Sequence, residues 1–190
     1  MNWILASGSP RRRELLEMLG VPDLTIRPAK GPERATPGAG PEQTVRELSL
    51  HKAQEVAQTC APEDIIIAAD TIVYLDGAIL GKPRDHDDAV RMLTALSGRE
   101  HIVYTGVAVL RGGELRQAAE HTAVRFRPLT SAEIERYIAT GEPMDKAGAY
   151  GIQGRGALFV AHLDGDYFNV MGLPLCRLGQ LLNELGVELL

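Results

Sequence analysis

The chain has 190 residues, of which 45% are hydrophobic and 24% charged, a composition typical of a folded domain and not of a disordered or fibrous chain. Its formal net charge of −5 argues against broad, nonspecific binding to nucleic acid. The two cysteines, Cys60 and Cys176, lie far apart with no other cysteine or histidine at metal-ligand spacing. Neither a disulfide scaffold nor a zinc module is therefore indicated, and a reducing compartment is favoured.

The N-terminal residues 1–6 contain an apolar run that is too short for a signal peptide and has no basic segment before it. No apolar stretch approaches the roughly 20 residues that a membrane span requires. Together with the sparse cysteines, these features predict a cytoplasmic protein with no membrane partner.

Hydrophobic periodicity and turn residues predict strands interspersed with helices. In chain order we expect a strand at 3–6, a helix at 10–19, a strand at 24–27, a helix at 42–60, strands at 65–69, 71–75 and 78–80, a helix at 85–96, strands at 101–110 and 114–126, a helix that begins at 130–133 and a last helix at 175–185. The chain has no internal repeat and no clear linker. The pattern indicates a single α/β domain over residues 1–190 with a mixed sheet.

Turn and capping residues indicate where several of these elements begin or end. Ser9 is a suitable N-cap, Pro10 suits the first helical position, and Gly20 suits the residue after the helix. The residues at 130–133, Thr-Ser-Ala-Glu, form a capping-box sequence. The Asp-Gly pair at 76–77 predicts a hairpin turn.

The segment 7–12, Ser-Gly-Ser-Pro-Arg-Arg, joins the first predicted strand to the first predicted helix. A helix N-terminus carries partial positive charge, so the arginines at 11–13 crowd a turn that prefers acidic residues. A bound anion resolves this conflict, because backbone N–H groups, serine hydroxyls and guanidinium groups can together hold phosphate oxygens. The alternative is a solvated basic helix start whose arginines pair with Glu14 or Glu17.

Asp70 follows the continuous apolar run at 65–69, a pattern typical of a central strand. This order predicts a carboxylate at the C-terminal end of a buried strand, where α/β proteins tend to place ligands. Such a carboxylate can bind a divalent metal ion or accept a proton from water. An Asx turn or a helix cap is the structural alternative.

Two lysines extend the predicted anion site. Lys82 lies between Gly81 and Pro83, which restrict the backbone on both sides of it, and Lys52 is an isolated lysine in the predicted helix 42–60. Either lysine alone is more often a solvated surface residue. Together with the arginine segment they indicate a polyanionic ligand, since several separated cations can span a triphosphate.

The segment 145–154, Asp-Lys-Ala-Gly-Ala-Tyr-Gly-Ile-Gln-Gly, is rich in small residues that permit close backbone approach. Gln153 in this segment offers both a donor and an acceptor to the edge of a base, although a structural glutamine in a glycine-rich turn fits equally well. The segment matches neither a P-loop nor a dinucleotide fingerprint. The scattered histidines and the lack of a Gly-x-Ser-x-Gly sequence argue against zinc and serine hydrolases.

Taken in order, these segments resemble the Maf family of nucleotide pyrophosphatases. The resemblance extends over nearly the whole chain, and the ordered set is far more specific than any one of its short pieces. The set consists of Ala6-Ser7-Gly8-Ser9-Pro10-Arg11-Arg12, Lys52-Ala53, Ala69-Asp70-Thr71-Ile72-Val73, Gly81-Lys82-Pro83, the 145–154 segment and Gly172-Leu173-Pro174.

The resemblance implies hydrolysis of nucleoside triphosphates between the α and β phosphates, which gives a monophosphate and pyrophosphate. It also implies an elongated, mixed-sheet α/β fold with two lobes around a cleft, similar to inosine triphosphatases. A divalent cation, Mg²⁺ or Mn²⁺, and the homodimer that relatives often form are further implications. The Gly-Ile-Gln-Gly version of the 145–154 segment resembles the branch that prefers dTTP and UTP, whereas the 7-methyl-GTP branch has Ser-Glu in place of Ile-Gln. Modified pyrimidine triphosphates are also candidate substrates for such a house-cleaning enzyme.

The family motifs imply roles for individual residues. Asp70 matches the proton acceptor and is a candidate metal ligand. The positions linked to substrate choice are Arg11, Thr71 and Gln153, and the expected phosphate contacts are Ser7, Arg12, Lys52 and Lys82. Relatives usually carry an acidic pair in the loop where this chain has Gly-Pro-Glu-Arg at 31–34. Glu33 is therefore the candidate for the second metal carboxylate, and Glu42 is the alternative.

The resulting hypothesis is an attack of water on the α-phosphorus, with Asp70 as the base and pyrophosphate as the leaving group. A non-catalytic, nucleotide-binding regulator of cell division is the alternative function. Asp70 among so many cations favours the enzyme, because binding alone needs no carboxylate that activates water. A nucleic-acid partner is disfavoured by the negative net charge and the 5% aromatic content.

Overall fold

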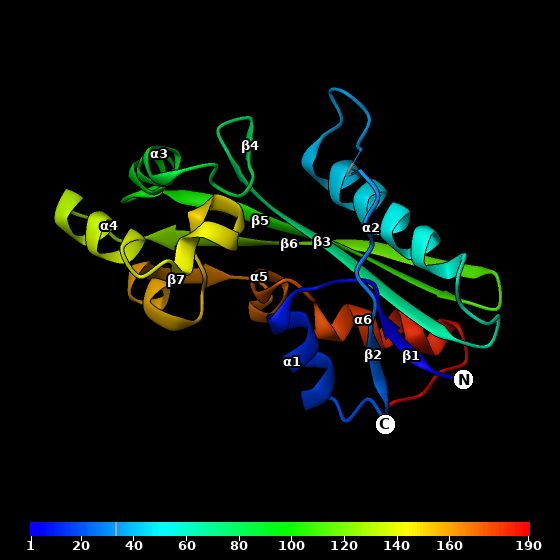
Figure 1. Cartoon of the computed structure of the whole chain (residues 1–190). Coiled ribbons are helices and arrows are strands. Elements are labelled where there is room, and N and C mark those ends of the chain that lie inside the picture. The colour runs from blue at the N-terminus through cyan, green and yellow to red at the C-terminus, as the bar shows by residue number, and fades with distance from the viewer. Residues whose placement is uncertain (33) are drawn as a thin grey trace. The chain divides into compact units, whose positions relative to one another are not determined.

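The computed structural model describes residues 1–32 and 34–190 (Figure 1). Its strands are β1 (Trp3–Leu5), β2 (Leu24–Ile26), β3 (Ile65–Leu75), β4 (Ala78–Leu80), β5 (Glu100–Arg111), β6 (Glu114–Phe126) and β7 (Val160–Asp164). Its α-helices are α1 (Pro10–Met18), α2 (Pro41–Ala57), α3 (His86–Leu96), α4 (Ser131–Ile138), α5 (Tyr167–Met171) and α6 (Leu175–Glu184). Short 3₁₀ segments lie at Glu142–Asp145, Ala147–Ala149 and Gly154–Phe159.

The strands of the described residues form one mixed sheet in the order β2-β1-β3-β5-β6-β7, with β4 paired to β3 off this path. β1 pairs in parallel with both β2 and β3, whereas β4 runs antiparallel to β3 and β7 runs antiparallel to β6. The predicted α/β class with a mixed sheet is confirmed.

The chain divides into two compact units, and β3, β5 and β6 contribute residues to both. Unit 1 consists of Met1–Asp70, Thr105–Glu120 and Gly172–Leu190, and unit 2 consists of Thr71–Tyr104 and His121–Met171. Within β3 the boundary falls between Asp70 and Thr71, two residues predicted to serve the same site. That the whole chain acts as a single domain stays a prediction.

In unit 1, α2 approaches β5 at a point where only glycine fits. A Cβ placed on Gly106 would lie 2.1 Å from the backbone oxygen of Val45, far inside contact distance. Val45 belongs to the buried face of α2, and Lys52 lies two helical turns further along the same face. The missing side chain of Gly106 thus allows the close approach of α2 and helps to set the position of Lys52.

The core of unit 2 contains an aromatic cluster around His101 of β5. The His101 ring lies 5.1 Å from the Phe126 ring and 5.3 Å from the Tyr150 ring, both edge to face. His101 Nε2 also lies 2.7 Å from Tyr150 Oη. Because the imidazole is buried, desolvation lowers the pKa of His101 from 6.5 to about 4 and keeps the ring neutral at physiological pH.

The buried histidine predicts a loss of stability as the pH falls. In the unfolded chain the His101 imidazole binds a proton near pH 6.5, but in the folded protein it does so only near pH 4. Lowering the pH through this window therefore favours unfolding, by up to about 3 kcal/mol. Urea unfolding at pH 7 and at pH 4 measures this effect. Between these two pH values, the free energy of unfolding should fall less for His101→Gln than for the wild type. His162→Gln, at an exposed position of β7, is the matched control and should follow the wild type. Identical profiles for His101→Gln and the wild type would contradict this origin of the pH dependence.

The structure corrects several predicted boundaries. The strands predicted at 65–69 and 71–75 are one strand, because the first half of β3 pairs with β1 and its second half pairs with β4. Asp70 therefore lies within a strand and does not follow its end. The helix predicted at 42–60 begins at Pro41 and ends at Ala57. The periodicity gives no sign of α5, whose five residues are too few for a clear helical pattern.

None of the described helices has both the length and the apolar character needed to cross a bilayer.

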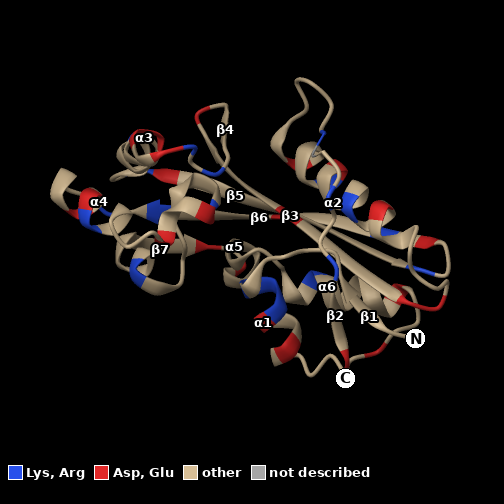
Figure 2. Ribbon diagram, viewed as in Figure 1, with Lys and Arg blue, Asp and Glu red and all other residues tan. Residues whose placement is uncertain are grey.

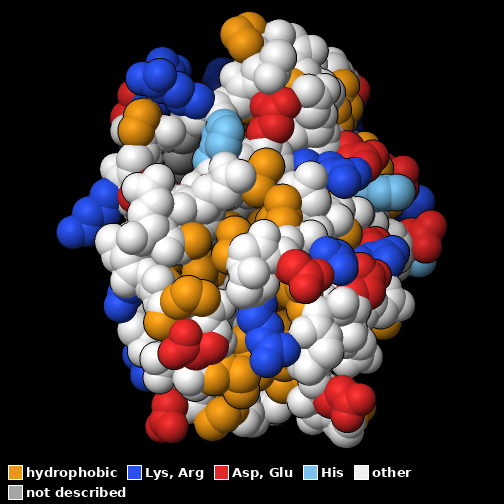
Figure 3. Space-filling view, turned by 90° about the vertical axis from the view of Figure 1, so that its right-hand side faces the viewer, with side chains coloured by type: hydrophobic (Ala, Val, Ile, Leu, Met, Phe, Trp, Pro, Cys, Tyr) orange, Lys and Arg blue, Asp and Glu red, His pale blue; other side chains and the backbone are white. Residues whose placement is uncertain are grey.

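On the face shown in Figure 3, acidic and basic side chains are mixed, with hydrophobic side chains exposed between them. Neither sign of charge dominates that face.

Candidate functional site

The loop between β1 and α1 is folded around the hydroxyl of Ser7. Ser7 Oγ accepts hydrogen bonds from Arg12 Nη1 at 2.9 Å and from the backbone N–H of Ser9 at 3.3 Å. Arg12 Nε donates to the carbonyl oxygen of Gly172 at 2.7 Å, so contacts on two sides fix the guanidinium plane. Ser7 is buried and Arg12 is half-buried. The loop is therefore held in place before any ligand arrives.

The first turn of α1 is basic and contains no acidic residue. Ser9 is the N-cap and Pro10 follows it, as predicted, but within the described residues the Ser9 side chain makes no capping hydrogen bond. Figure 2 shows basic residues in this turn and acidic ones nearer the end of the helix. Arg13 pairs with Glu17 at 2.7 Å. For this arginine, the alternative of a solvated side chain paired with a glutamate of the same helix is therefore confirmed. Arg12 instead points back to the loop, beside backbone N–H groups that can bind an anion.

Lys52 and Asp70 form an ion pair in unit 1. Lys52 Nζ donates to Asp70 Oδ1 at 2.5 Å, and the exposed fractions of the two side chains are only 17% and 11%. The pair connects α2 to the middle of β3. Because poorly hydrated charges interact more strongly than exposed ones, the lysine holds the carboxylate in a defined orientation. The predicted phosphate-binding lysine thus contacts the predicted catalytic carboxylate directly.

The register of β1 and β3 places Ser7 and Asp70 at the same end of this strand pair. Leu5 pairs with Ile67, and the Ala6 N–H donates to the Ile67 carbonyl oxygen at 2.8 Å. β1 ends there while β3 continues, so Ser7 and Asp70 both lie shortly beyond the last paired residues. Although Asp70 lies within β3, it still lies at the carboxyl edge of a parallel pair, where α/β proteins tend to bind ligands.

In unit 2, the Gly-Lys-Pro motif lies next to the 145–154 segment. The Gly148 N–H donates to the carbonyl oxygen of Gly81 at 3.0 Å, one residue before the exposed Lys82. Gly148 has a φ of +68°, and a Cβ on it would lie 2.8 Å from the Val73 side chain of β3. Only glycine suits both conditions. Two motifs that are far apart in the sequence are thereby joined.

The three residues predicted to select the substrate come from different elements. Arg11 is half-buried in the first turn of α1, and Thr71 follows Asp70 in β3. Gln153 is half-buried, with an extended backbone, just before the 3₁₀ segment Gly154–Phe159. Arg11 belongs to unit 1, whereas Thr71 and Gln153 belong to unit 2. Their shared role in substrate choice stays a prediction.

Gly172 also contributes to the candidate site, although the sequence patterns assign it no functional role. Its carbonyl oxygen orients Arg12 across 160 positions of sequence. Its φ of +111° is unfavourable for other residues, which explains a glycine at this point. The Gly-Leu-Pro motif at 172–174, part of the family resemblance, is the sequence signal that points to it.

The candidate metal ligands do not form a cluster in the described part of the chain. Residues 1–32 and 34–190 contain no group of three or more His, Cys, Asp or Glu side chains suited to bind one. Glu33 lies outside the described residues, and its alternative, Glu42, is an exposed side chain 3.6 Å from Arg46. Asp70 is the carboxylate that remains. A single carboxylate fits Mg²⁺, which proteins often bind through one or two carboxylates together with substrate phosphates.

Comparison with known sequences gives matches over nearly the whole chain. The sequence model of the Maf family, described as Maf-like protein, matches residues 2–185. A dTTP/UTP pyrophosphatase from Symbiobacterium thermophilum is 51% identical, over 96% of this chain and 93% of that relative. One from Moorella thermoacetica is 52% identical, over 97% of this chain and 95% of that relative. Among solved structures, the Staphylococcus aureus Ham1 protein has a TM-score of 0.48 and 13% identity, covering 66% of this chain and 72% of that one.

Proposed function

Because the chain belongs to the Maf family, we propose that it hydrolyses dTTP and UTP to the nucleoside monophosphate and pyrophosphate. The resemblance inferred from the ordered motifs is confirmed by the family match. The names of relatives about half identical to this chain support the choice of substrates. The same activity on modified pyrimidine triphosphates would make the protein a house-cleaning enzyme of the nucleotide pool.

The observation that carries this proposal is the Lys52–Asp70 pair at the end of the strand pair that also leads to Ser7. Binding a triphosphate requires cations, but cleaving it also requires a group that accepts a proton from water. Asp70 is assigned that task. An ammonium group has three N–H donors, so Lys52 can hold Asp70 Oδ1 with one and a phosphate oxygen with another.

The loop between β1 and α1 is assigned to the phosphates. Arg12 already has its guanidinium fixed by Ser7 and Gly172, so little reorganisation is needed when charge develops on the leaving pyrophosphate. The Ser7 hydroxyl and the backbone N–H groups of the first turn of α1 add donors. Lys82, exposed after β4, is proposed as a further phosphate contact.

A divalent cation, Mg²⁺ or Mn²⁺, is part of the proposal, with Asp70 as its ligand among the described residues. When bound, the ion would neutralise phosphate charge and polarise the phosphoryl oxygens. Lys52 keeps the Asp70 carboxylate oriented, and Arg12 holds the phosphate chain. Arg11 and Thr71 are proposed to contribute to substrate choice.

Gln153→Glu should impair UTP hydrolysis through base recognition. The amide of Gln153 can donate to a pyrimidine carbonyl oxygen, whereas a carboxylate cannot donate and repels it. We expect kcat/KM for UTP to fall about 10–100-fold, the effect of losing one well-placed hydrogen bond. The inhibition constant of inorganic pyrophosphate should stay unchanged, because this ligand has no nucleobase for Gln153 to contact. An equal loss of kcat/KM for every nucleotide would contradict base recognition by Gln153.

Pyrophosphate release from UTP and dTTP, with and without Mg²⁺, tests the proposed function. A panel that adds CTP, ATP, GTP and modified pyrimidine triphosphates identifies the preferred base. Tight binding of UTP without pyrophosphate release would instead favour the non-catalytic regulator of cell division. The homodimer, the cytoplasmic location and the lack of a nucleic-acid partner stay predictions.

A further inference from the structure

Gln153 lies in a short loop whose two arms are held by one pair of side chains, Tyr137 and Glu142. On the arm before Gln153, the Gly151 N–H donates to Tyr137 Oη at 3.1 Å. On the arm after it, the Arg155 N–H donates to Glu142 Oε2 at 3.0 Å and the Gly156 N–H donates to Glu142 Oε1 at 3.1 Å. Tyr137 Oη donates to Glu142 Oε1 at 2.9 Å and so joins the two anchors.

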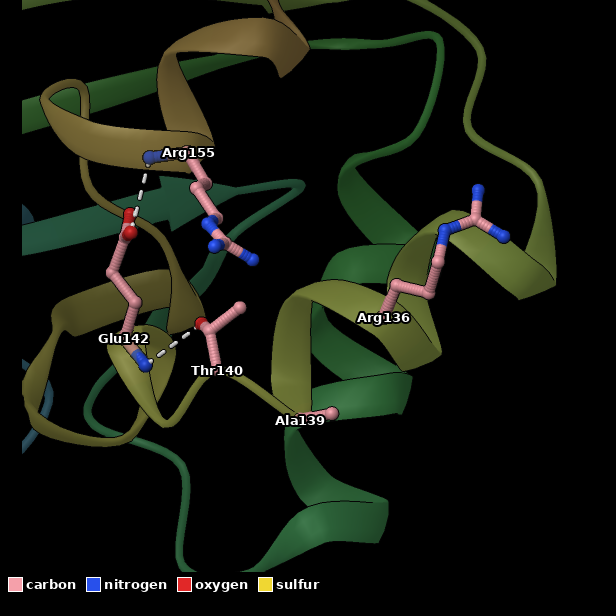
Figure 4. Close-up of a pocket in the computed structure, with 5 residues that line it drawn as sticks. All are labelled: Arg136, Ala139, Thr140, Glu142 and Arg155. Atoms are coloured by element: carbon pink, nitrogen blue, oxygen red, sulfur yellow. Dashed lines mark hydrogen bonds between the residues drawn. The ribbon is translucent and has the colours of Figure 1, made fainter.

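Glu142 is itself fixed by its backbone. Its N–H donates to Thr140 Oγ1 at 3.1 Å, and Figure 4 shows this bond together with the one from Arg155 to the carboxylate. Its carbonyl oxygen accepts a hydrogen bond from Lys146 Nζ at 2.6 Å. In Figure 4 the Glu142 side chain turns toward the Arg155 backbone and not toward Arg136. The carboxylate therefore binds the loop, and Glu142 also lines the open hollow beside it, together with Arg136 and Ala139.

The glycines of the loop fit closely around these anchors. Gly154 has a φ of +68°, and a Cβ on it would lie 2.8 Å from Glu142 Oε2. A Cβ on Gly156 would lie 2.3 Å from the Gly151 carbonyl oxygen and 2.7 Å from Tyr137 Oη. The loop thus packs so closely that a side chain at Gly154 would displace Glu142, and one at Gly156 would displace the opposite arm.

The charge states of the two anchors maintain this arrangement at neutral pH. Burial tends to raise the pKa of Glu142, but hydrogen bonds from the amides of Arg155 and Gly156 outweigh it, so the pKa is lowered. Burial also raises the pKa of Tyr137 well above its usual range. Glu142 is therefore a carboxylate that only accepts hydrogen bonds, and Tyr137 is a phenol that donates to it.

We propose that Glu142 is a positioning residue for nucleobase selection, which acts by holding the loop that carries Gln153. The inference rests on the proposed function, in which Gln153 contacts the pyrimidine. Discrimination by one amide depends on its placement to within a fraction of an ångström. Glu142 anchors the loop on one side directly and on the other side through Tyr137.

Glu142→Gln is the principal test. The variant keeps the size of the side chain but replaces one acceptor oxygen with an N–H₂ group, which cannot accept from a backbone amide. The ratio of kcat/KM for UTP to that for CTP should fall about 10–100-fold, mainly through KM for UTP, because misplacement by about 1 Å has effects of this size. Glu135→Gln is the matched control, since Glu135 on α4 pairs with His86 and not with the loop. Its ratio should equal that of the wild type.

A double variant shows whether Glu142 acts through Gln153. In a Gln153→Ala background, Glu142→Gln should produce no further change in the UTP/CTP ratio, whereas a purely structural role would lower activity toward both nucleotides in either background.

Tyr137→Phe is a second, independent variant. It keeps the ring packed against Phe159, 4.8 Å away, but removes the hydroxyl that joins the two anchors. It should reproduce the loss of selectivity even if Glu142→Gln does not fold.

An unchanged UTP/CTP ratio in folded Glu142→Gln or Tyr137→Phe would overturn the inference and leave the proposed function intact. An additive effect of Glu142→Gln in the Gln153→Ala background would also overturn it. A wild-type protein that releases no pyrophosphate from UTP or dTTP would overturn the proposed function and this inference with it.

Discussion

Asp70→Asn is expected to lower kcat for UTP hydrolysis by about 10³-fold or more, within the range that general base catalysis contributes. Asparagine has nearly the same shape, and its carbonyl oxygen can still accept a hydrogen bond from Lys52, but it cannot take a proton from water. Pyrophosphate release at saturating UTP measures kcat. Thermal unfolding followed by circular dichroism should show that the variant stays folded.

Asp64→Asn is a matched control, because Asp64 is a second buried aspartate immediately before β3. Its Oδ1 accepts a hydrogen bond from the Asn2 N–H at 2.9 Å, and its Oδ2 accepts one from the Ala61 N–H at 3.1 Å. Weakening these bonds should lower the midpoint of thermal unfolding, whereas kcat should stay within about twofold of the wild type. Near-normal turnover by Asp70→Asn would refute its role as the base.

Features whose partners lie a few residues away could be predicted from the sequence. The capping box of α4 forms as expected, with Glu133 N–H donating to Thr130 Oγ1 and Thr130 N–H donating to the Glu133 carboxylate. Pro10 begins α1, and Gly20, with a φ of +72°, follows its end. These outcomes depend on backbone geometry and local hydrogen bonding, which short sequence patterns describe well.

Features that depend on distant partners could not be predicted in the same way. Asp70 lies in the middle of β3 because β1 ends early and β4 takes over the pairing, and no local pattern specifies where a neighbouring strand ends. The Lys52–Asp70 contact requires α2 to approach the sheet at Gly106. Sequence patterns indicated the types of residue in the candidate site, whereas their pairing follows from tertiary packing.

Arg12→Ala is expected to lower kcat/KM for UTP by about 10²-fold, the effect of removing one preorganised donor to developing charge. Arg12 contacts Ser7 and Gly172 through different nitrogens, so its removal also frees the Ser7 hydroxyl from its fixed position. Steady-state kinetics with UTP measures the loss. The inhibition constant of inorganic pyrophosphate should rise in parallel, because both ligands use the same loop.

Arg13→Ala makes the same change of charge one residue further along the same helix turn. Arg13 is 60% exposed and paired with Glu17, so kcat/KM should stay within about twofold of the wild type, since exposed ion pairs contribute little. Equal losses in Arg12→Ala and Arg13→Ala would mean that only net charge matters and would refute a specific role for Arg12.

Arg12→Lys separates charge from geometry. A single ammonium on a flexible stem cannot reproduce contacts that the planar guanidinium makes in two directions. It should therefore recover only a small part of the activity lost in Arg12→Ala, because the loop needs an oriented donor and not merely a positive charge.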